Sequence, residues 1–551
     1  MNDALLWLAV ALPLAGAAAT RFAPAGYPIA PLAALLAAVP SWLLLVLAAG
    51  GEDASNGFAW LPAGGLELGL QLDGLAATMS ATVATVGLVV VVYSGGYFAS
   101  DPRRRSALAG LLGFLAAMQG LVLADGYLTL LIFWELVGAA SARLILLSRR
   151  DPAAPPAAVR AFLTTRSADL GLYLAVLALF AATGGLAFVA ERPAGALGDL
   201  VAVGLIVAAV GKSAQVPLQT WLSAAMAGPT PVSALLHSAT MVAAGVYLLV
   251  RSEGLLAGWP LELVGWIGAI AAVLGAGIAL AQSDLKRVLA GSTTSQLGLM
   301  FVGLAAGGAA VAMFALVAHA AGKAGMFLAT GVLQHNRGTT SLTKLAGAGR
   351  DDRTAFAGFA IGALSIAAVP PFAAFWSKDH IAAAVEEANV AWFALVLLAA
   401  AGSAAYLLRP ALVLWRANGA GGMVERGGRG RMLAGVGALA LGSLTLGVAG
   451  GPLTELLDAP ELPASPLSLA LSLAAVAAGA LAVLVRIRLP EWIAASFRAQ
   501  LFTDRALRLI VQRPLLLAAR CADALERRGI DAAVDGLARG TELAERGRGR
   551  V

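Results

Sequence analysis

Long apolar stretches follow one another along almost the whole chain, separated by short polar loops. A helix of about 18 or more apolar residues is long enough to cross a bilayer, and fifteen stretches meet this condition. They lie at 4–20, 28–49, 76–97, 106–124, 126–148, 160–184, 198–218, 230–250, 260–282, 288–306, 310–334, 355–376, 380–408, 433–451 and 466–485. The pattern therefore predicts an all-α polytopic membrane protein with about 15 transmembrane helices.

Basic residues are distributed unevenly between the two sides of the predicted membrane. Loops after odd-numbered spans, together with the tail from Arg486 onward, contain 31 Lys and Arg residues. Loops after even-numbered spans contain two, Arg192 and Arg251. Because Lys and Arg in short loops stay on the cytoplasmic side, we expect the N-terminus outside and the C-terminal tail in the cytoplasm.

The composition narrows the class of protein. Of 551 residues, 59% are apolar and 13% are charged, whereas soluble proteins carry about 25% charged residues. An ordinary soluble enzyme is therefore excluded. The net charge of +6 comes from scattered basic residues and not from a patch, so no nucleic acid partner is expected. The single cysteine, Cys521, excludes a disulfide framework and a thiolate metal cluster. We expect no metal and no cofactor in this chain.

The C-terminal segment 490–551 has a different pattern, in which Leu, Ile and Ala are mixed with many Arg and several acidic residues. Such a mixture is typical of an amphipathic helix on a membrane surface. We expect a cytoplasmic tail that contacts the membrane surface or a partner subunit. The alternative is a solvated charged tail.

Eight charged residues lie inside predicted spans: Glu135, Arg143, Arg166, Asp169, Lys212, Lys323, Lys378 and Asp379. An unpaired charge facing lipid at the bilayer centre costs about 2.5–3.5 kcal/mol or more. These side chains are therefore expected to face the protein interior or water. We expect Glu135 to pair with Lys212, and Arg166 to form a supporting ion pair with Asp169.

Two predicted spans contain proline near a lysine. Pro217 interrupts the seventh span, and Pro370 and Pro371 interrupt the twelfth. Proline removes a helical hydrogen bond and clashes with the preceding turn, so both helices should be broken. The two spans are five apart, and a displacement by an odd number of spans inverts a repeat in the membrane. We predict two inverted five-helix repeats, each with a broken helix, an arrangement that marks ion pathways in transporters.

This reading divides the chain into five regions. They are 1–105 with spans one to three, 106–251 with the first repeat, 252–410 with the second repeat, 411–489 with the last two spans, and the tail 490–551.

The titratable cations are confined to one part of the chain. All five Lys and all four His lie between residues 212 and 380, whereas Arg occurs throughout. A buried Lys can release its proton while Arg stays protonated, and His titrates near neutral pH. A proton relay is therefore predicted from these residues and the buried acids: Glu135, Lys212, His237, His319, Lys323, Lys378 and Asp379. The alternative for each lysine is a structural ion pair, and for each histidine a hydrogen-bonded core residue.

Several motifs resemble a known family. Residues 211–222 read GKSAQVPLQTWL and residues 228–237 read GPTPVSALLH. Further matches are Trp134-Glu135, Thr165-Arg166, Asp169, the segment 284–290, His319 with Lys323, and Ser377-Lys378-Asp379. Together they resemble the antiporter-like membrane subunits of respiratory complex I, most closely the distal subunit L (subunit 5 in mitochondria), over about residues 68–410.

The resemblance implies two inverted repeats that carry proton half-channels. It also implies a role for each matched residue: Glu135 is the acid of span five, Lys212 the lysine of the first broken helix, His237 the link to the centre, Lys323 the central lysine, and Lys378 with Asp379 the terminal site. Subunit L usually continues into a long lateral helix and one more span. Here residues 502–539 resemble the approach to that helix and no further span follows, so a short form is expected.

Three functions are compatible with these residues. The first is a proton-translocating subunit of a bacterial NADH:quinone oxidoreductase in the inner membrane, with electron transfer in partner subunits. The second is a proton-conducting subunit of an inorganic-carbon uptake or cation/proton antiporter complex without NADH chemistry. The third is a scaffold with vestigial channel residues. Each implies other membrane subunits and the lipid bilayer as partners, and the first two also imply protons.

Overall fold

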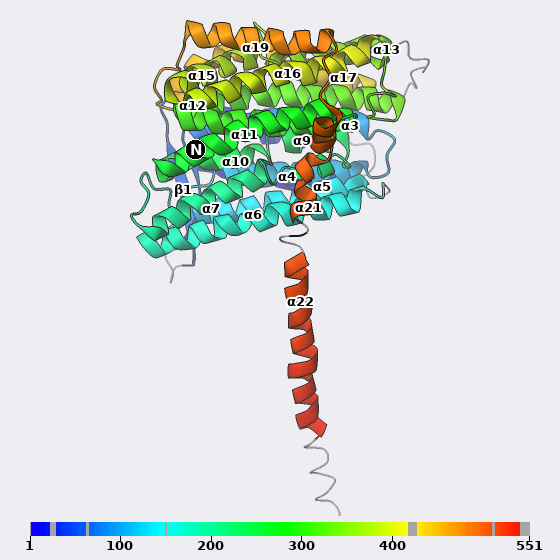
Figure 1. Cartoon of the computed structure of the whole chain (residues 1–551). Coiled ribbons are helices and arrows are strands. Elements are labelled where there is room, and N and C mark those ends of the chain that lie inside the picture. Colours follow the sequence, from blue (N-terminus) through cyan, green and yellow to red (C-terminus); the bar gives the residue numbers. More distant parts are fainter. Residues whose placement is uncertain are drawn as a thin grey trace, which may run out of the picture. The chain divides into compact units, whose positions relative to one another are not determined.

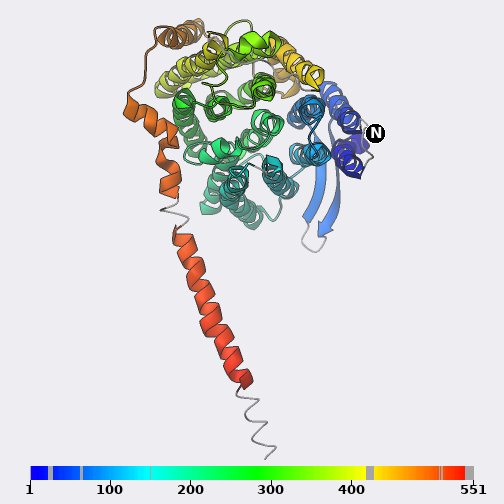
Figure 2. The same ribbon diagram turned by 90° about the vertical axis from the view of Figure 1, so that its right-hand side faces the viewer.

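The computed structural model describes residues 2–22, 29–61, 66–148, 151–416, 427–507, 509 and 513–539. The chain divides into two units, residues 1–498 and 499–551. Within the described residues, twelve helices are long and apolar enough to cross a membrane. In the first unit the long helices lie alongside one another (Figure 1), and Figure 2 shows them nearly end-on. The predicted all-α polytopic class is confirmed.

The helices of the first unit are, in chain order, α1 (Asn2–Phe22), α2 (Ile29–Ala49), α3 (Gly74–Tyr97), α4 (Arg104–Val122), α5 (Tyr127–Ile145), α6 (Ala154–Thr183), α7 (Ala196–Lys212), α8 (Thr220–Ala225), α9 (Thr230–Ser238), α10 (Ala243–Arg251), α11 (Trp259–Ala281), α12 (Leu285–Arg337), α13 (Ala348–Asp351), α14 (Arg353–Ile366), α15 (Ala373–Ala388), α16 (Val390–Arg416), α17 (Arg429–Thr445), α18 (Gly450–Leu456), α19 (Pro466–Leu484) and α20 (Glu491–Arg498). Short 3-10 turns follow α5, α10 and α17.

Two predicted spans form one continuous element, α12, which contains 53 residues. At 1.5 Å per residue a straight helix of this length would measure about 80 Å, far more than the roughly 30 Å hydrocarbon core of a bilayer. The chain turns at Gly308, where φ is 76° and ψ is −171°. Glycine adopts this conformation without a steric penalty, so it separates two membrane-length halves.

A β-hairpin that the hydrophobic pattern did not predict lies between α2 and α3. Strands β1 (Ala54–Leu61) and β2 (Leu66–Leu72) pair antiparallel, with Gly57 opposite Gly69. The backbone of β2 also bonds the loop before α5, because the Gln71 N–H donates to the Leu123 carbonyl at 2.7 Å. Strands of this length are too short for a search for spans of 18 residues, which is why they were missed.

The predicted breaks at proline are confirmed, and two further interruptions appear. At the first proline the chain leaves α7 and resumes as α8, and at the second it leaves α14 and resumes as α15. The predicted span 380–408 is wrong, because α15 continues to Ala388 and Asn389 starts a new helix. The Asn389 Oδ1 accepts the N–H groups of Ala391 and Trp392 at 2.9 and 3.2 Å, an N-cap. The predicted span 230–250 corresponds to one membrane-length segment, Thr230–Arg251, within which the helix is interrupted between α9 and α10.

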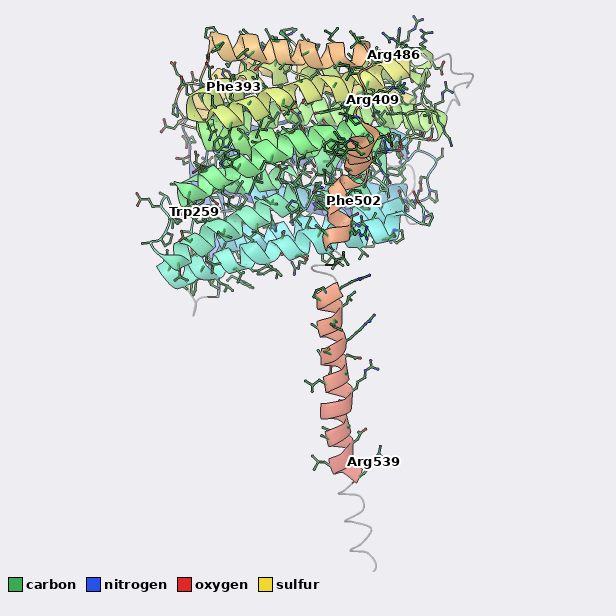
Figure 3. All side chains as sticks on the ribbon, viewed as in Figure 1. Trp259, Phe393, Arg409, Arg486, Phe502 and Arg539 are labelled. Carbon is green, nitrogen blue, oxygen red and sulfur yellow. The ribbon has the colours of Figure 1, made fainter. Side chains whose placement is uncertain are left out.

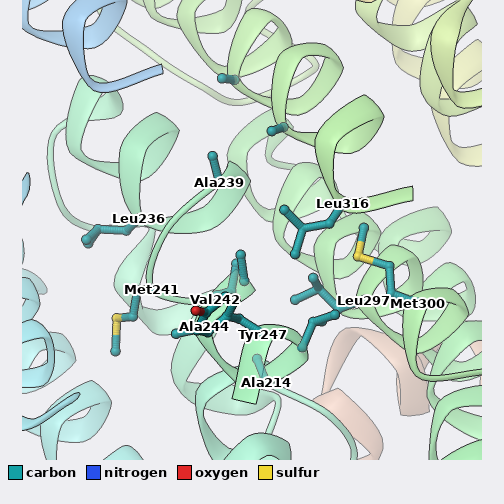
Figure 4. Packing of buried hydrophobic residues seen from close by; sticks show 14 of the residues in the cluster. Ala214, Leu236, Ala239, Met241, Val242, Ala244, Tyr247, Leu297, Met300 and Leu316 are labelled. Atoms are coloured by element: carbon teal, nitrogen blue, oxygen red, sulfur yellow. The ribbon is translucent and has the colours of Figure 1, made fainter. Parts of the chain in front are cut away.

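The interior of the first unit is apolar and densely packed. Figure 4 shows part of it, with Leu236 of α9, Tyr247 of α10, and Leu297 and Leu316 of α12 among the labelled residues, all four of them buried. Side chains also cover the outside of the bundle (Figure 3), where large apolar residues are exposed as on a lipid-facing surface. Trp259 at the start of α11 is 45% exposed, and tryptophan is enriched at membrane–water interfaces.

The tail is helical in its described part. In the first unit, Phe497 of α20 lies against Gly277 of α11. The second unit contains α21 (Thr503–Leu507) and α22 (Arg513–Leu525), and an ion pair joins Arg527 to Asp523 at 2.9 Å. The predicted tail continues into residues 540–551, which lie outside the described residues.

An ion pair joins the start of α3 to the end of α10. Asp73 accepts the Ala76 N–H at 2.8 Å as the N-cap of α3, and its Oδ1 accepts from Nη2 of Arg251 at 3.0 Å. The Arg251 guanidinium lies over the rings of Phe188 and Tyr247. Burial raises the pKa of Asp73, but the hydrogen bond and charge of Arg251 outweigh it, so the pKa is lowered overall.

We expect Asp73→Asn to lower the melting temperature of the purified protein, because the arginine loses its charged partner. The effect at pH 7 should be about 1 kcal/mol, since the carboxylate is partly solvated. A lowered pKa in the folded state means that the carboxylate stabilises the fold above its unfolded pKa of about 4, and that this contribution is lost as the pH falls through the folded value. Thermal unfolding of both proteins between pH 3 and 7 checks this. The more exposed pair Arg192–Asp199, 3.7 Å apart, supplies the control Asp199→Asn, which should change little; equal shifts at every pH would contradict the argument.

Candidate functional site: buried polar groups along the bundle

The first helix break is built from backbone hydrogen bonds that the protein satisfies internally. Helix α7 ends at Lys212, and the chain turns through Ala214, whose φ is +49°. The Gln215 N–H reaches back to the Val210 carbonyl at 2.9 Å, and the Thr294 hydroxyl donates to the Ala214 carbonyl at 3.1 Å. Irregular backbone at membrane depth is tolerated where protein groups bond it in this way.

The second break repeats the same backbone pattern 154 residues later. This is the number of residues that separates Pro217 from Pro371. Ala368 has a φ of +60°, and the Val369 N–H reaches back to the Leu364 carbonyl at 3.0 Å. Each of these positions corresponds to one in the first break at that spacing. The two broken helices therefore share one local geometry.

Lys212 lies at the first break with its ammonium wholly buried. Its Nζ donates to Oδ2 of Asp169 on α6 at 3.1 Å, with side-chain exposures of 0% and 2%. The indole N–H of Trp134 donates to the other oxygen of this carboxylate at 2.5 Å, and the Lys212 Nζ lies 4.8 Å from the centre of the Trp134 ring. Both carboxylate oxygens thus have partners, which a buried ion pair requires.

The predicted partners of the two acids are wrong. Glu135 was expected to bind Lys212, and Arg166 to bind Asp169, but the structure pairs Glu135 with Arg166 and Asp169 with Lys212. Asp169 is short and 1% exposed on the side of α6 that packs against α7. Arg166 is 42% exposed and its guanidinium also lies over the ring of Tyr173 at 5.5 Å. A long arginine side chain keeps its charge toward the boundary, where it meets Glu135.

The central lysine, Lys323, is bound by hydroxyl groups. Its Nζ donates to the Ser292 Oγ at 2.5 Å, and Ser292 donates to the Tyr406 hydroxyl at 2.9 Å. Gln296 donates to the same tyrosine hydroxyl at 3.0 Å and to the Ser403 Oγ at 3.1 Å. Within the described residues no carboxylate lies in ion-pair reach of Lys323, unlike Lys212.

The hydroxyl groups around Lys323 were not among the residues predicted from the sequence. A signal was available, because residues 292–296 read STTSQ inside an otherwise apolar span. These five residues are buried, and such a run in a membrane helix has to bond other protein groups. Tyr406 carried no such signal, since a single tyrosine near the end of a span is also typical of the membrane interface.

The two predicted histidines are buried without a protein hydrogen-bond partner among the described residues. His237 is 0% exposed, and both ring nitrogens lack a partner. Its ring lies between those of Trp221 and Phe327, with centroids 6.0 and 6.4 Å away. His319 is 2% exposed and equally unpartnered, one helical turn before Lys323. Neither histidine is hydrogen-bonded to a lysine of the predicted relay.

Lys378 lies in the second half of the second broken helix. Its Nζ donates to the Ile366 carbonyl at 2.5 Å, at the last residue of α14. A cation at this end of a helix is favoured by the helix dipole and by the free carbonyls. Ile366 is the counterpart of Lys212 at the 154-residue spacing. One oxygen of the adjacent Asp379 is buried without a partner, and both side chains line a small cavity.

The site therefore consists of ion-paired, hydroxyl-bound and unpartnered titratable groups on α5, α6, α7, α9, α12 and α15, several of them at helix breaks. Protons could move between such groups by exchange along hydrogen bonds. In the described part of the chain, no three His, Cys, Asp or Glu side chains lie close enough to hold a metal ion.

Comparisons with known proteins agree with this architecture. Residues 124–402 match the family described as NADH:quinone oxidoreductase/Mrp antiporter, TM. Residues 60–106 match the family described as NADH-Ubiquinone oxidoreductase (complex I), chain 5 N-terminus.

The curated relatives carry related names. NADH-quinone oxidoreductase subunit L of Mycobacterium tuberculosis is 42% identical over 397 residues, which cover 68% of this chain and 63% of that protein. NAD(P)H-quinone oxidoreductase chain 5 of a Picosynechococcus species is 42% identical over 361 residues, covering 61% and 54%. The chain thus matches 63% or less of the length of these relatives.

Solved structures share the fold. A chain of the Mrp complex from a Dietzia species aligns with 99% of this chain and 63% of its own length, with a TM-score of 0.80 and 29% identity. A chain of respiratory complex I from Thermus thermophilus aligns with 85% of this chain and 99% of its own, with a TM-score of 0.73 and 23% identity. With half of its length matched by the first family, the chain belongs to the membrane subunits shared by NADH:quinone oxidoreductases and Mrp antiporters.

Proposed function

We propose that the chain is a proton-translocating, non-redox membrane subunit of a bacterial NADH:quinone oxidoreductase of the complex I type. It would work in the inner membrane beside other membrane subunits, with its N-terminus outside and its tail in the cytoplasm. Electron transfer would take place in partner subunits. The relatives named subunit L and chain 5 support this assignment.

The observation that carries the proposal is the contrast between the two buried lysines. Lys212 donates to the Asp169 carboxylate, whereas Lys323 donates to the hydroxyl of Ser292 and has no carboxylate partner among the described residues. A neighbouring carboxylate favours the protonated, charged form of a lysine. A hydroxyl group both donates and accepts hydrogen bonds, so a hydroxyl next to a lysine can pass a proton on. Two lysines with different partners suit a pathway in which protons are retained at one position and released at another.

The other site residues take supporting roles in this proposal. Glu135 of α5 and Arg166 of α6 form a second ion pair. Arg166 lies about one helical turn before Asp169 on α6, so a change in this pairing would alter the charge near Lys212. His237, buried between aromatic rings, would connect the two halves. His319 would exchange protons with Lys323, because the two residues are four positions apart and lie on the same face of the helix. Lys378 and Asp379 would form the terminal site next to the small cavity.

A second candidate function is proton conduction in a cation/proton antiporter complex without NADH chemistry. The Mrp complex supports it, because its chain aligns with 99% of this chain at a TM-score of 0.80, and the complex I chain aligns with 85% at 0.73. The same buried groups would serve both functions.

Affinity purification of the tagged full-length chain from native membranes, followed by a transport assay, distinguishes the two functions. For the first, NADH-oxidising subunits should copurify, and NADH should drive acidification of inverted vesicles that contain the complex. For the second, the complex should oxidise no NADH, and an imposed sodium gradient should move protons. Vesicles that show neither NADH-driven nor sodium-driven proton movement would contradict both and favour a scaffold.

A further inference from the structure

A groove on the membrane-facing side of α1, α4 and α5 ends at two arginines. It has a volume of about 520 Å³ and an almost wholly apolar lining. Helix α4 packs against both α1 and α5, so it forms the floor and the other two form the walls. Small residues of α4, among them Gly110 and Gly113, keep the groove open. A Cβ added at Gly113 would meet no atom closer than 4.0 Å, the Cβ of Ala17.

The two arginines, Arg21 and Arg143, lie in the last turns of α1 and α5. Both line the groove, and both helices run in the same direction in the predicted topology. Among the described residues, neither guanidinium has a carboxylate partner. The Arg21 guanidinium lies 5.9 Å from the ring centre of the neighbouring Phe22. The groove therefore combines an apolar channel with two uncompensated positive charges at one end.

The depth of the groove matches one leaflet of a bilayer. On α1 its lining runs from Val10 to Arg21, which is about 17 Å along a helix. Half of the hydrocarbon core of a bilayer is about 15 Å. A transmembrane helix of a partner would need an apolar groove along the whole thickness, whereas an acyl chain reaches from the headgroup to the midplane. Basic pockets between transmembrane helices on the cytoplasmic side bind anionic lipid headgroups.

We propose that this groove is a binding site for an anionic phospholipid of the cytoplasmic leaflet. The phosphate binds between Arg21 and Arg143, with planar guanidinium groups suited to a phosphate. One acyl chain lies on α4 between Ala17 and Ala140. The last turns of α1 and α5 are then held at the membrane surface by the lipid. This site is independent of the proton pathway.

Crosslinking of a photoreactive phosphatidylglycerol, with a diazirine near the end of one acyl chain, tests the site in nanodiscs containing the full-length chain. We expect labelled peptides from α1, α4 and α5. Arg21→Gln with Arg143→Gln should lower the labelling about 30-fold, because each cation near the surface contributes about fivefold. Arg21→Lys with Arg143→Lys should retain most of it. Photoreactive phosphatidylcholine should label these helices weakly in every variant.

Gly113→Leu tests the acyl chain separately from the charge. The Cβ of a leucine there meets no atom closer than 4.0 Å, and its larger side chain takes up space in the groove, so it should abolish labelling while both arginines remain. The matched control is Arg416→Gln, an exposed arginine in the last turn of α16 outside the groove, which should label like the wild type. Equal labelling in all variants would overturn the site. If inorganic phosphate competes with the photoreactive lipid and Gly113→Leu is labelled normally, the two arginines bind an anion but the groove does not bind an acyl chain, and the lipid site is wrong. A protein crosslink in place of lipid in the native complex would show a partner helix there.

Discussion

Replacing Lys212 by methionine is expected to lower proton translocation by the assembled complex at least tenfold while the protein still inserts and assembles. Methionine has nearly the length of lysine and no charge, so the packing against Trp134 is kept. The Asp169 carboxylate then lies buried without its cation, which is strongly disfavoured. The variant thus lacks the exchangeable ammonium at the first break. Proton uptake into inverted membrane vesicles, measured with a pH-sensitive dye, provides the rate.

A second variant separates proton transport from structural stability. In Lys212→Met with Asp169→Leu, the buried pair is replaced by apolar groups, which is often neutral for stability. Its stability should recover relative to Lys212→Met, but its transport should not. The matched control is Lys344→Met, because this lysine is exposed in a loop. If the double variant pumps at the wild-type rate, the pair is structural and the relay is wrong at this position.

Replacing Lys323 by methionine should also reduce transport at least tenfold, for a different reason. This ammonium is bound by Ser292 and, through it, by Tyr406. Its loss removes the charge that this hydroxyl cluster binds and, within the part of the chain that the structure describes, leaves no unpaired carboxylate beside it. We therefore expect a smaller loss of stability than in Lys212→Met. Comparison of vesicle transport and thermal unfolding for both variants checks this difference.

Tyr406→Phe shows whether the hydroxyls take part. It removes the hydroxyl that Ser292 and Gln296 both bond and keeps the ring. Transport should fall severalfold if the proton passes through this hydroxyl. The control Tyr173→Phe alters a tyrosine on α6 beside Arg166 and should leave transport close to normal. If transport is unchanged in Tyr406→Phe, the proton does not pass through the Tyr406 hydroxyl.

The all-helical membrane class and the helix breaks followed from the sequence because both depend on strong local rules, whereas the fifteen predicted spans compare with twelve candidate spans in the described residues. A bilayer demands about 18 apolar residues per span, and proline disrupts a helix wherever it falls in the interior. The start of α16 at Val390 was missed although Glu386, Glu387 and Asn389 interrupt the apolar stretch just before it, because the search joined the apolar residues on both sides into one span. The β-hairpin was missed because its strands are short and its pairing is long-range compared with a helix turn.

The site residues were recognisable from residue type, but their partners were not. Asp169 and Arg166 are three residues apart on one helix, and which of them meets Lys212 depends on how α6 packs on α7. Gly211, whose added Cβ would lie 2.1 Å from the Ala168 Cβ, brings these helices close together. This close approach favours the short aspartate over a long arginine at the contact. Side-chain length and helix distance together set the pairing, and a linear sequence contains only the first.

The turn at Gly308 has a further consequence for the central lysine. Ser292 lies 16 residues before the turn and Lys323 lies 15 residues after it, so both are about 23 Å from the bend along their own half-helices. Ser292 and Lys323 can therefore meet only because the two antiparallel half-helices place them at nearly the same distance from the turn. Each residue added to one half-helix would turn the following side chains by about 100° and move them 1.5 Å. The depth and direction of the Lys323 ammonium thus depend on the number of residues between Lys323 and Gly308, the turn that separates the two halves of α12.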